Sequence, residues 1–220
     1  MKWLERLHGR HVHPRRVRVL SERLAELIPM GARVLDVGCG DGLIAHFIGQ
    51  KRPDVEVRGL DVLVRSETHI PVQPFDGRHL PCEAARPDIV MFIDVLHHTE
   101  DPLALLREGA RLATKGLLIK DHTVDGLMAG PILRFMDQVG NARHGVAIPY
   151  NYWPKQRWLS SCGVLGLTAT TWISDLNLYQ WPADWIFGRS LHFLARFELN
   201  EPAGSIMKPM PSHAERPFIV

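Results

Sequence analysis

Three alternating glycines form the clearest candidate for a ligand-binding turn. Gly38, Gly40 and Gly42 follow the apolar residues 32–37 and precede the apolar residues 43–51. Glycine lacks a Cβ atom, so the backbone can turn sharply there and a ligand can approach it closely. A glycine triplet is informative when it lies between a strand and a helix. The spacing therefore predicts a turn that holds part of a nucleotide-like ligand.

Two acidic residues near this turn narrow the class of ligand. Asp36 lies two positions before the first glycine, where its charge would repel a pyrophosphate but suit a ligand with an amino group and a sulfonium. Asp61 lies nineteen positions beyond Gly42, at the end of a second apolar run, where a carboxylate can accept both hydroxyl protons of a ribose. The GxGxG spacing also differs from the GxGxxG of dinucleotide sites. We therefore expect a nucleoside cofactor that carries positive charge.

Histidines follow two later apolar runs and are candidates for proton transfer. His97 and His98 come after residues 88–93, and His122 comes after residues 117–120. Histidine is the usual general base near neutral pH. The alternatives are that His97 and His98 shape the cofactor pocket and that His122 makes a structural hydrogen bond. Neighbouring strand residues face opposite ways, so Asp121 is not expected to orient His122 while the strand continues.

A polar and aromatic segment after these histidines is a candidate acceptor site. Its side chains either bind the acceptor or pack as a loop against the sheet edge, and one of its histidines is a further catalytic candidate. The candidates are Asn141, Arg143, His144, Tyr150 and Tyr152. Residues 179–188 are rich in aromatic side chains. They are interpreted as a lid over a flat or lipid-like acceptor, as a membrane-surface contact, or as part of the core.

Strand-like and helix-like segments alternate along the first half of the chain, which is typical of a parallel sheet covered on both faces by helices. The predicted helices span residues 15–28, 43–51, 101–112, 124–140 (interrupted near residue 130) and 154–162. The predicted strands span residues 32–37, 55–61, 70–73, 88–93, 117–120, 167–173 and 191–199. We expect one domain over residues 1–200, with an acceptor-covering insert at about 122–160 and a proline-rich tail at 201–220.

The composition argues against several functional classes. The 220 residues carry 26 basic and 24 acidic side chains, so no basic face for nucleic acid is expected. Arg15, Arg16 and Arg18 are interpreted as a solvated helix face. Three widely spaced cysteines and scattered histidines predict neither disulfides nor a metal site. With no apolar run long enough to cross a membrane, a cytoplasmic monomer or homodimer is expected, with peripheral membrane contact possible.

Four segments in order resemble a known family. Residues 34–42, Asp61, residues 75–81 and residues 88–98 are similar to the class I S-adenosylmethionine (SAM)-dependent methyltransferases, in the type 11 group that includes ubiquinone- and menaquinone-biosynthesis enzymes. The likeness covers about residues 30–121. It implies a Rossmann-like, seven-stranded, mostly parallel sheet with an antiparallel last strand. The cofactor-binding residues that it implies, with Asp76 near the adenine amino group, are Asp36, Val37, Gly38, Cys39, Gly40, Asp61, Val62, Asp76, Gly77, Asp94, Val95 and His98.

The expected function is methyl transfer from SAM to a small-molecule or lipid-like acceptor, at oxygen or carbon. The chain lacks the [DNS]-P-P-[YFW] pattern after residue 93, which argues against methylation of nucleic-acid or protein amide nitrogens. One alternative is a SAM-binding partner or sensor without turnover. Another is an NAD-dependent oxidoreductase, which Asp36 and the glycine spacing disfavour.

Overall fold

The computed structural model describes residues 12–81, 86–141, 149–188 and 190–200, except for the side chains of Gly140 and Asn141. The helices are α2 (His13–Leu27), α3 (Leu43–Lys51), the short 3-10 helix η2 (Leu96–His98), α4 (Pro102–Leu112), α5 (Ala129–Asn141), α6 (Lys155–Val164) and α7 (Ala183–Phe187). The strands are β1 (Arg33–Val37), β2 (Glu56–Asp61), β3 (Val72–Pro74), β4 (Ile89–Ile93), β5 (Gly116–His122), β6 (Leu167–Ile173) and β7 (His192–Leu199).

The seven strands form one mixed sheet in the order β3-β2-β1-β4-β5-β7-β6. Strands β1 to β5 pair in parallel, whereas β7 is inserted between β5 and β6 and runs antiparallel to both. This arrangement confirms the predicted Rossmann-like sheet and its antiparallel last strand. The short strand expected at residues 70–73 corresponds to β3, slightly further along the chain.

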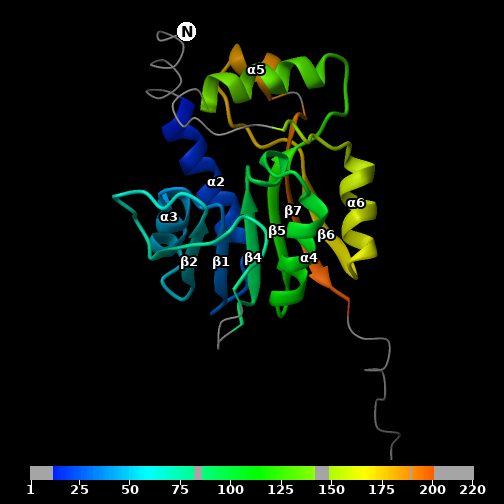
Figure 1. The fold of residues 1–220 in the computed structure, drawn as a ribbon. Helices are drawn as coiled ribbons and strands as arrows, with labels where there is room; N and C mark the ends of the chain where they lie inside the picture. The colour runs from blue at the N-terminus through cyan, green and yellow to red at the C-terminus, as the bar shows by residue number, and fades with distance from the viewer. Residues whose placement is uncertain (1–11, 82–85, 142–148, 189, 201–220) are drawn as a thin grey trace, which may run out of the picture.

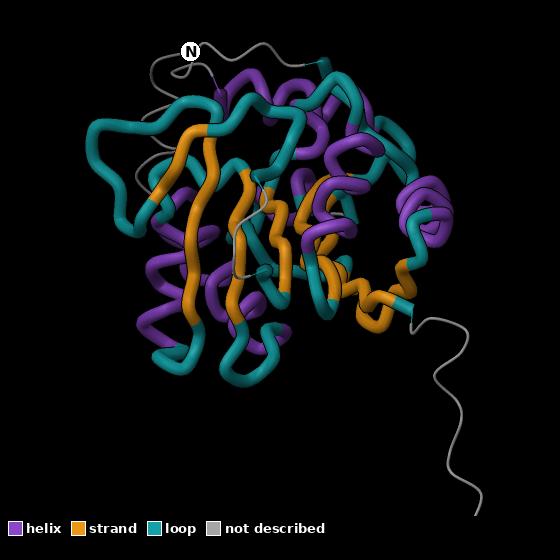
Figure 2. The backbone as a smooth tube through the Cα atoms, turned by 60° about the horizontal axis from the view of Figure 1, so that its bottom comes forward, coloured by secondary structure: helices purple, strands orange, loops and turns teal. Residues whose placement is uncertain are grey.

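Helices cover both faces of the sheet (Figure 2). In β4, Val90 and Phe92 pack into the core beneath α4 and α6, while Ile89 and Met91 pack into the core beneath α2 and α3. This alternation follows from the two-residue period of a strand. Because both faces are covered, the central strands are almost continuously apolar. Two hydrophobic layers therefore fix which way each strand residue points, including the polar residues at the strand ends.

The parallel strands end at the same edge of the sheet, and α5 lies across that edge (Figure 1). The chain leaves β1 in one direction to form β2 and reaches β4 on the other side of β1. Ligands bind at such a switch point in open α/β sheets, at the carboxyl ends of the strands. The glycine turn, η2 and the end of β5 all meet there.

Two helix starts show how local sequence sets the elements around this edge. Asp101 caps α4 by accepting a hydrogen bond from the Ala104 backbone N–H at 3.0 Å, with Pro102 in the first turn. The expected helix over residues 124–140 is wrong in its first part. The structure begins α5 at Ala129, because Pro131 is favoured in the first turn of a helix and not in its interior.

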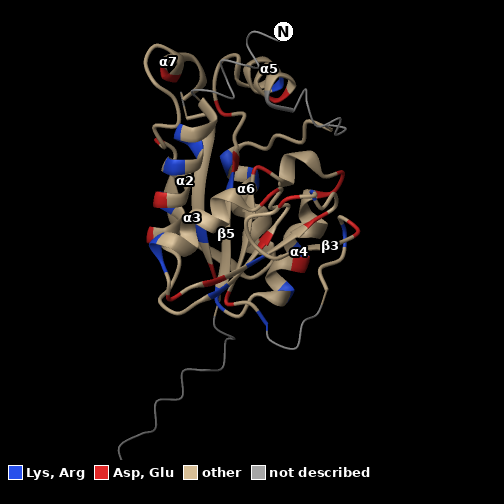
Figure 3. Ribbon diagram, turned by 90° about the vertical axis from the view of Figure 1, so that its left-hand side faces the viewer, with Lys and Arg blue, Asp and Glu red and all other residues tan. Residues whose placement is uncertain are grey.

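The described surface carries both signs of charge. Acidic and basic residues are interspersed over the elements in Figure 3. Among the described residues, no helix combines the length and the apolar character that crossing a membrane requires. The expectation that nucleic acid is not a partner stays a prediction.

Replacing Phe92 by alanine is expected to lower the free energy of unfolding by about 3–5 kcal/mol, because the phenyl ring is fully buried in β4 and its loss leaves a cavity. Urea unfolding followed by circular dichroism measures the change. Leu127→Ala is the control, since Leu127 is 90% exposed and its loss should cost less than about 0.5 kcal/mol. Equal losses in the two variants would contradict the burial of Phe92.

Candidate functional site

The glycine turn after β1 needs glycine at each of its three alternating positions. Gly38, Gly40 and Gly42 have φ angles of 73°, 62° and 75°, in the left-handed region that residues with a Cβ rarely adopt. A Cβ on Gly38 would lie 2.4 Å from Val95 Cγ2, and a Cβ on Gly42 would lie 2.4 Å from Ile70 Cγ1. The predicted tight turn is therefore present, and Gly42 leads directly into α3.

Asp61, at the end of β2, stabilises this turn by hydrogen bonding. Its Oδ2 accepts a hydrogen bond from the Gly40 backbone N–H at 2.7 Å, and its Oδ1 accepts one from Leu63 N–H at 2.9 Å. The carboxylate predicted to hold a ribose thus lies directly beside the glycines. The spacing of Asp61 from the glycines was enough to predict this proximity. In the structure the proximity arises because β1 and β2 are parallel neighbours.

Asp36 fits a positively charged ligand group. It is 2% exposed, and its Oδ1 has no hydrogen-bond partner among the described residues. Burial, together with the charge of Asp61, raises the pKa of Asp36 to about 7. A nearby cation would stabilise the ionised form. A buried carboxyl group with a free oxygen beside a glycine turn would suit a cofactor that carries an amino group and a sulfonium.

A cavity of about 480 Å³ opens at this edge of the sheet. The glycine turn forms one wall, α2 forms a second, and α5 and α7 contribute apolar side chains. The histidines that follow β4 and β5 form a further part of the lining. Seven of the predicted site residues line it: Gly38, Cys39, Gly40, Asp94, His97, His98 and His122.

Other predicted residues lie outside the cavity lining. They are Asp36, Val37, Asp61, Val62, Asp76, Gly77, Val95, Tyr150 and Tyr152. Asp76 is exposed, and its carboxylate accepts hydrogen bonds from the backbone N–H groups of Arg78 and His79 at 2.8 and 2.7 Å. Its other oxygen lies 2.7 Å from His79 Nδ1. The side chain therefore closes its own turn in this structure, and its predicted contact with adenine stays a prediction.

Asp94 at the end of β4 is the centre of a charged cluster that sequence reasoning missed. Arg16 Nη2 of α2 donates to Asp94 Oδ2 at 2.6 Å, and Lys120 Nζ of β5 donates to Asp94 Oδ1. Lys120 is fully buried and also lies 3.3 Å from His192 Nδ1. Burial alone would raise the pKa of Asp94, but Lys120 and Arg16 outweigh it and hold that pKa well below its ordinary value.

The interpretation of Arg16 as part of a solvated face is therefore wrong. Arg16 is half-buried, lines the cavity, and lies 3.4 Å from the Tyr179 hydroxyl oxygen as well as pairing with Asp94. Charge runs do not distinguish the helix positions that face a buried carboxylate from those that face water. A lysine inside the apolar run of β5 was the one available signal for a buried acidic partner.

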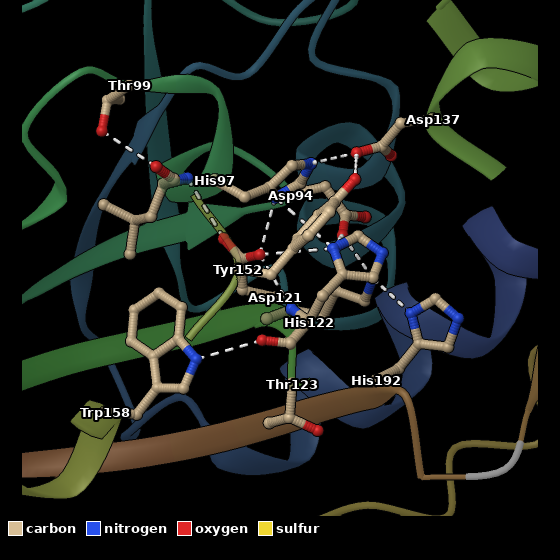
Figure 4. Close-up of polar contacts among 12 residues, drawn as sticks. Asp94, His97, Thr99, Asp121, His122, Thr123, Asp137, Tyr152, Trp158 and His192 are labelled. Atoms are coloured by element: carbon tan, nitrogen blue, oxygen red, sulfur yellow. Dashed lines mark hydrogen bonds and ion pairs between the residues drawn. The ribbon is translucent and has the colours of Figure 1, made fainter. Parts of the chain in front are cut away.

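His97 and Asp121 form a buried pair (Figure 4). His97 Nδ1 lies 2.6 Å from Asp121 Oδ1. The same carboxylate accepts from the Leu96 N–H at 3.1 Å and from the His122 N–H at 2.8 Å. Burial would raise the pKa of Asp121, but the charge of His97 and the side-chain hydrogen bonds from His122 and His97 hold that pKa below its usual range. For His97, burial would lower the pKa, and the Asp121 carboxylate reverses this and raises it.

The expectation that Asp121 would not contact His122 is corrected in part. The Asp121 carboxylate reaches round the end of β5, and its Oδ1 lies 3.3 Å from His122 Nδ1. Its closer partner is His97, from η2 after the neighbouring strand. Burial and the charge of Lys120 lower the pKa of His122. His98 lines the cavity, and burial and His97 lower its pKa to about 4.

Three of these atoms lie close enough together to hold a metal ion: His97 Nδ1, Asp121 Oδ1 and His122 Nδ1. The 2.6 Å between His97 and Asp121 is a hydrogen-bond distance. It is shorter than the roughly 3.3 Å that separates ligands around a tetrahedral zinc ion with bonds of about 2.0–2.1 Å. Hydrogen bonding accounts for the group, and the predicted lack of a metal site stays a prediction.

The predicted acceptor segment is partly described. The Tyr152 hydroxyl donates to Asp137 Oδ2 of α5, and Tyr150 lies beneath the Arg134 guanidinium at 5.5 Å. Asn141 ends α5. Arg143 and His144 lie outside the described residues. Of residues 179–188, Tyr179 belongs to the core, while Trp181 and Trp185 are exposed.

Fold and site together define a nucleoside-binding α/β protein of the methyltransferase type. Residues 8–160 match the family described as Methyltransferase domain, which is more than half of the chain. The chain belongs to this family. The match confirms the predicted class, the SAM-dependent methyltransferases, and with it SAM as the predicted cofactor.

Known proteins support the same class. The chain is 33% identical over 117 residues to a ubiquinone biosynthesis O-methyltransferase of Proteus mirabilis, over 48% of this chain and 46% of that one. It therefore spans about half the length of the curated relatives it matches.

Two solved structures share the fold. A SAM-dependent methyltransferase from Mesorhizobium loti has a TM-score of 0.59 at 16% identity, covering 80% of this chain and 96% of that one. Magnesium protoporphyrin IX methyltransferase from Synechocystis, with bound S-adenosylhomocysteine (SAH), has a TM-score of 0.55 at 17% identity, covering 83% and 81%.

Asp94→Asn is expected to lower the free energy of unfolding by roughly 3 kcal/mol, because it leaves the buried Lys120 ammonium without its anion. Adding Lys120→Met should recover part of the loss. Urea unfolding measures both. Glu22→Gln is the control, since Glu22 forms an exposed pair with Lys51 that should be worth less than about 1 kcal/mol. A double variant less stable than Asp94→Asn would show that Lys120 is not the group left unpaired.

Proposed function

We propose that this protein transfers the methyl group of SAM to a small-molecule or lipid-like acceptor, at oxygen or carbon. The observation that carries this proposal is a cavity that joins the glycine turn to the histidines after β4 and β5. SAM, when bound, supplies an activated methyl group on a sulfonium. Methyl transfer mainly requires that the acceptor is held in line with the departing sulfur, so one cavity has to hold both molecules.

The cofactor half of the site is proposed on the glycine turn. Gly38 and Gly40 leave room for the ligand, Asp61 lies where it can exchange its bond with Gly40 for ribose hydroxyls, and Asp36 offers a free oxygen for a cationic group. Val37, Cys39, Val62, Gly77, Val95 and His98 are proposed to complete the cofactor contacts.

The acceptor half is proposed beneath α5 and α7. Phe135 and Met136 of α5 and Phe187 of α7 give this part of the cavity an apolar character. An apolar wall with a few polar groups is typical of sites for small organic ligands. We therefore assign residues 122–160 as the acceptor-covering segment, with Asn141, Arg143, Tyr150 and Tyr152 as candidate acceptor contacts. The similarity to a Proteus protein named as an O-methyltransferase supports oxygen as the acceptor atom.

His97 and His122 are the proposed catalytic candidates among the described residues, because both line the cavity. His144 stays a prediction. A SAM-binding protein without turnover is the second candidate function, since the cofactor half alone would suffice for it. Transfer of labelled methyl to any acceptor would decide between the two.

SAM and SAH are expected to bind the wild-type protein, and Asp61→Ala is expected to weaken both by about 1–3 kcal/mol because the buried ribose hydrogen bonds are lost. Isothermal titration calorimetry measures this. Glu56→Ala, an exposed carboxylate at the other end of β2, is the matched control and should leave the affinity unchanged. Absence of binding to folded wild-type protein would remove the basis for the methyltransferase proposal.

A further inference from the structure

His97 lies between two carboxylates that belong to different parts of the fold. Asp121 of β5 lies at its Nδ1, and Asp137 Oδ2 of α5 lies 3.5 Å from its Nε2 (Figure 4). This Nε2 is buried, lies in a residue that lines the cavity, and makes no hydrogen bond within the described part of the chain. Buried polar atoms without a partner are rare in proteins and call for an explanation. A ligand that donates a proton to Nε2 would give this atom a partner.

We propose that His97 is the general base that removes the proton from an acidic hydroxyl group of the acceptor, a phenol or an enol, and that Asp121 positions it. This inference rests on the proposed function and names the acceptor atom as oxygen. It also gives Asp121, which sequence reasoning did not place beside His97, a defined part in the reaction.

Hydrogen bonding around Asp121 fixes the tautomer of His97. The carboxylate receives two backbone N–H groups, from Leu96 and His122, so it is held ionised and in place. An ionised carboxylate can only accept, so the proton of a neutral His97 ring lies on Nδ1. The lone pair then lies on Nε2, the nitrogen that makes no hydrogen bond to any residue that the structure describes. A base needs a lone pair at the atom that faces the acceptor.

The acidity of the acceptor hydroxyl decides which class of hydroxyl group His97 can deprotonate. The His97 imidazole, whose pKa its carboxylate neighbours raise above the ordinary 6.5, can share a proton with a phenol, whose pKa is about 10, whereas an aliphatic hydroxyl is far more weakly acidic. A flat ring also suits the cavity, since Phe135 and Phe187 stack with their planes 15° apart and their centroids 6.4 Å apart. The acidity argument and the aromatic lining together favour a phenol over an aliphatic hydroxyl.

The proposed step balances in atoms and charge. The acceptor oxygen forms a bond to the methyl carbon, the carbon–sulfur bond breaks with its electron pair on sulfur, and His97 Nε2 takes the hydroxyl proton. Asp121 stabilises the imidazolium that results. The proton then leaves to solvent as the products dissociate, which restores the neutral base.

The acidic limb of the pH–rate profile is expected to report His97, because protonated His97 cannot act as a base. The carboxylate neighbours raise its pKa, so the rate should fall as the pH drops through a value above the ordinary 6.5. Asp121→Asn should move this limb to lower pH. The titratable and charged groups that face His97 are Asp94, His98, Asp121, His122, Asp137 and Tyr152.

Nitrogen-15 NMR of the SAH-bound protein tests the base without turnover. A neutral His97 ring with its proton on Nδ1, and a pKa that Asp121→Asn lowers, would support the proposal. A proton on Nε2, or a pKa that does not respond to Asp121→Asn, would overturn it. An unfolded Asp121→Asn variant would be recognised in the same spectra, and the tautomer of the wild-type ring then decides alone.

Methyl transfer to a matched set of acceptors tests whether the acceptor group is an acidic hydroxyl. The probes are 1-naphthol, 1-naphthylamine, 1-naphthalenethiol, 1-naphthoate and 1-naphthalenemethanol, which share one ring system. Methylation of 1-naphthol at oxygen, faster than of the others, supports the proposal. Faster methylation of another probe, methylation of 1-naphthol at carbon, or methylation of none by protein that binds SAM overturns it. In the last case calorimetric binding would leave the cofactor assignment standing.

His97→Gln is expected to lower kcat for 1-naphthol by roughly 10²- to 10⁴-fold while SAM affinity is retained. His46→Gln is the matched control, because His46 lies on α3, outside the cavity lining, and its ring hydrogen-bonds only to Gln50 of the same helix within the described part of the chain. Equal rates for His97→Gln and His46→Gln would exclude His97 as the base.

Discussion

The site depends on keeping ionised side chains buried at the carboxyl edge of the sheet. A buried charge is tolerated only when partners replace the water that it has lost. Asp94 receives Arg16 and Lys120, and Asp121 receives His97 and two backbone N–H groups. The partners come from α2, β5 and η2, which are distant in the sequence. The same contacts therefore hold these elements together and set the electrostatics of the cavity.

Most of the fold could be predicted from the sequence because its signals are local. The apolar runs of the parallel strands, the capping residues of α4 and the glycines at positive φ each act within a few residues. The boundary of α5 was the main error, and it arose from treating Pro131 as an interruption when it belongs to the first turn.

The side-chain partners at the site were harder to predict, because they depend on which strand ends lie side by side. Sequence reasoning looked for the partner of Asp121 within its own strand, whereas that partner is His97, which follows β4. Lys120 follows three apolar residues, and the adjacent Asp121 faces the other side of the sheet. Its partner Asp94 therefore becomes evident only once β4 and β5 are paired. Asp61 was predictable because a known spacing places it beside the glycine turn.

Side-chain alternation in β5 has a consequence for how such a protein can change during evolution. Leu117 and Ile119 pack under α4 and α6 on the same face as Asp121, while Leu118 and Lys120 face α2. Deleting one residue within the apolar run would turn Asp121 away from His97, yet leucine and isoleucine would still fill both layers. A change in the length of β5 could therefore leave the protein able to fold and still remove the contact between Asp121 and His97. Length variation among functional descendants should accumulate in the connections, and in particular in the segment between β5 and β6.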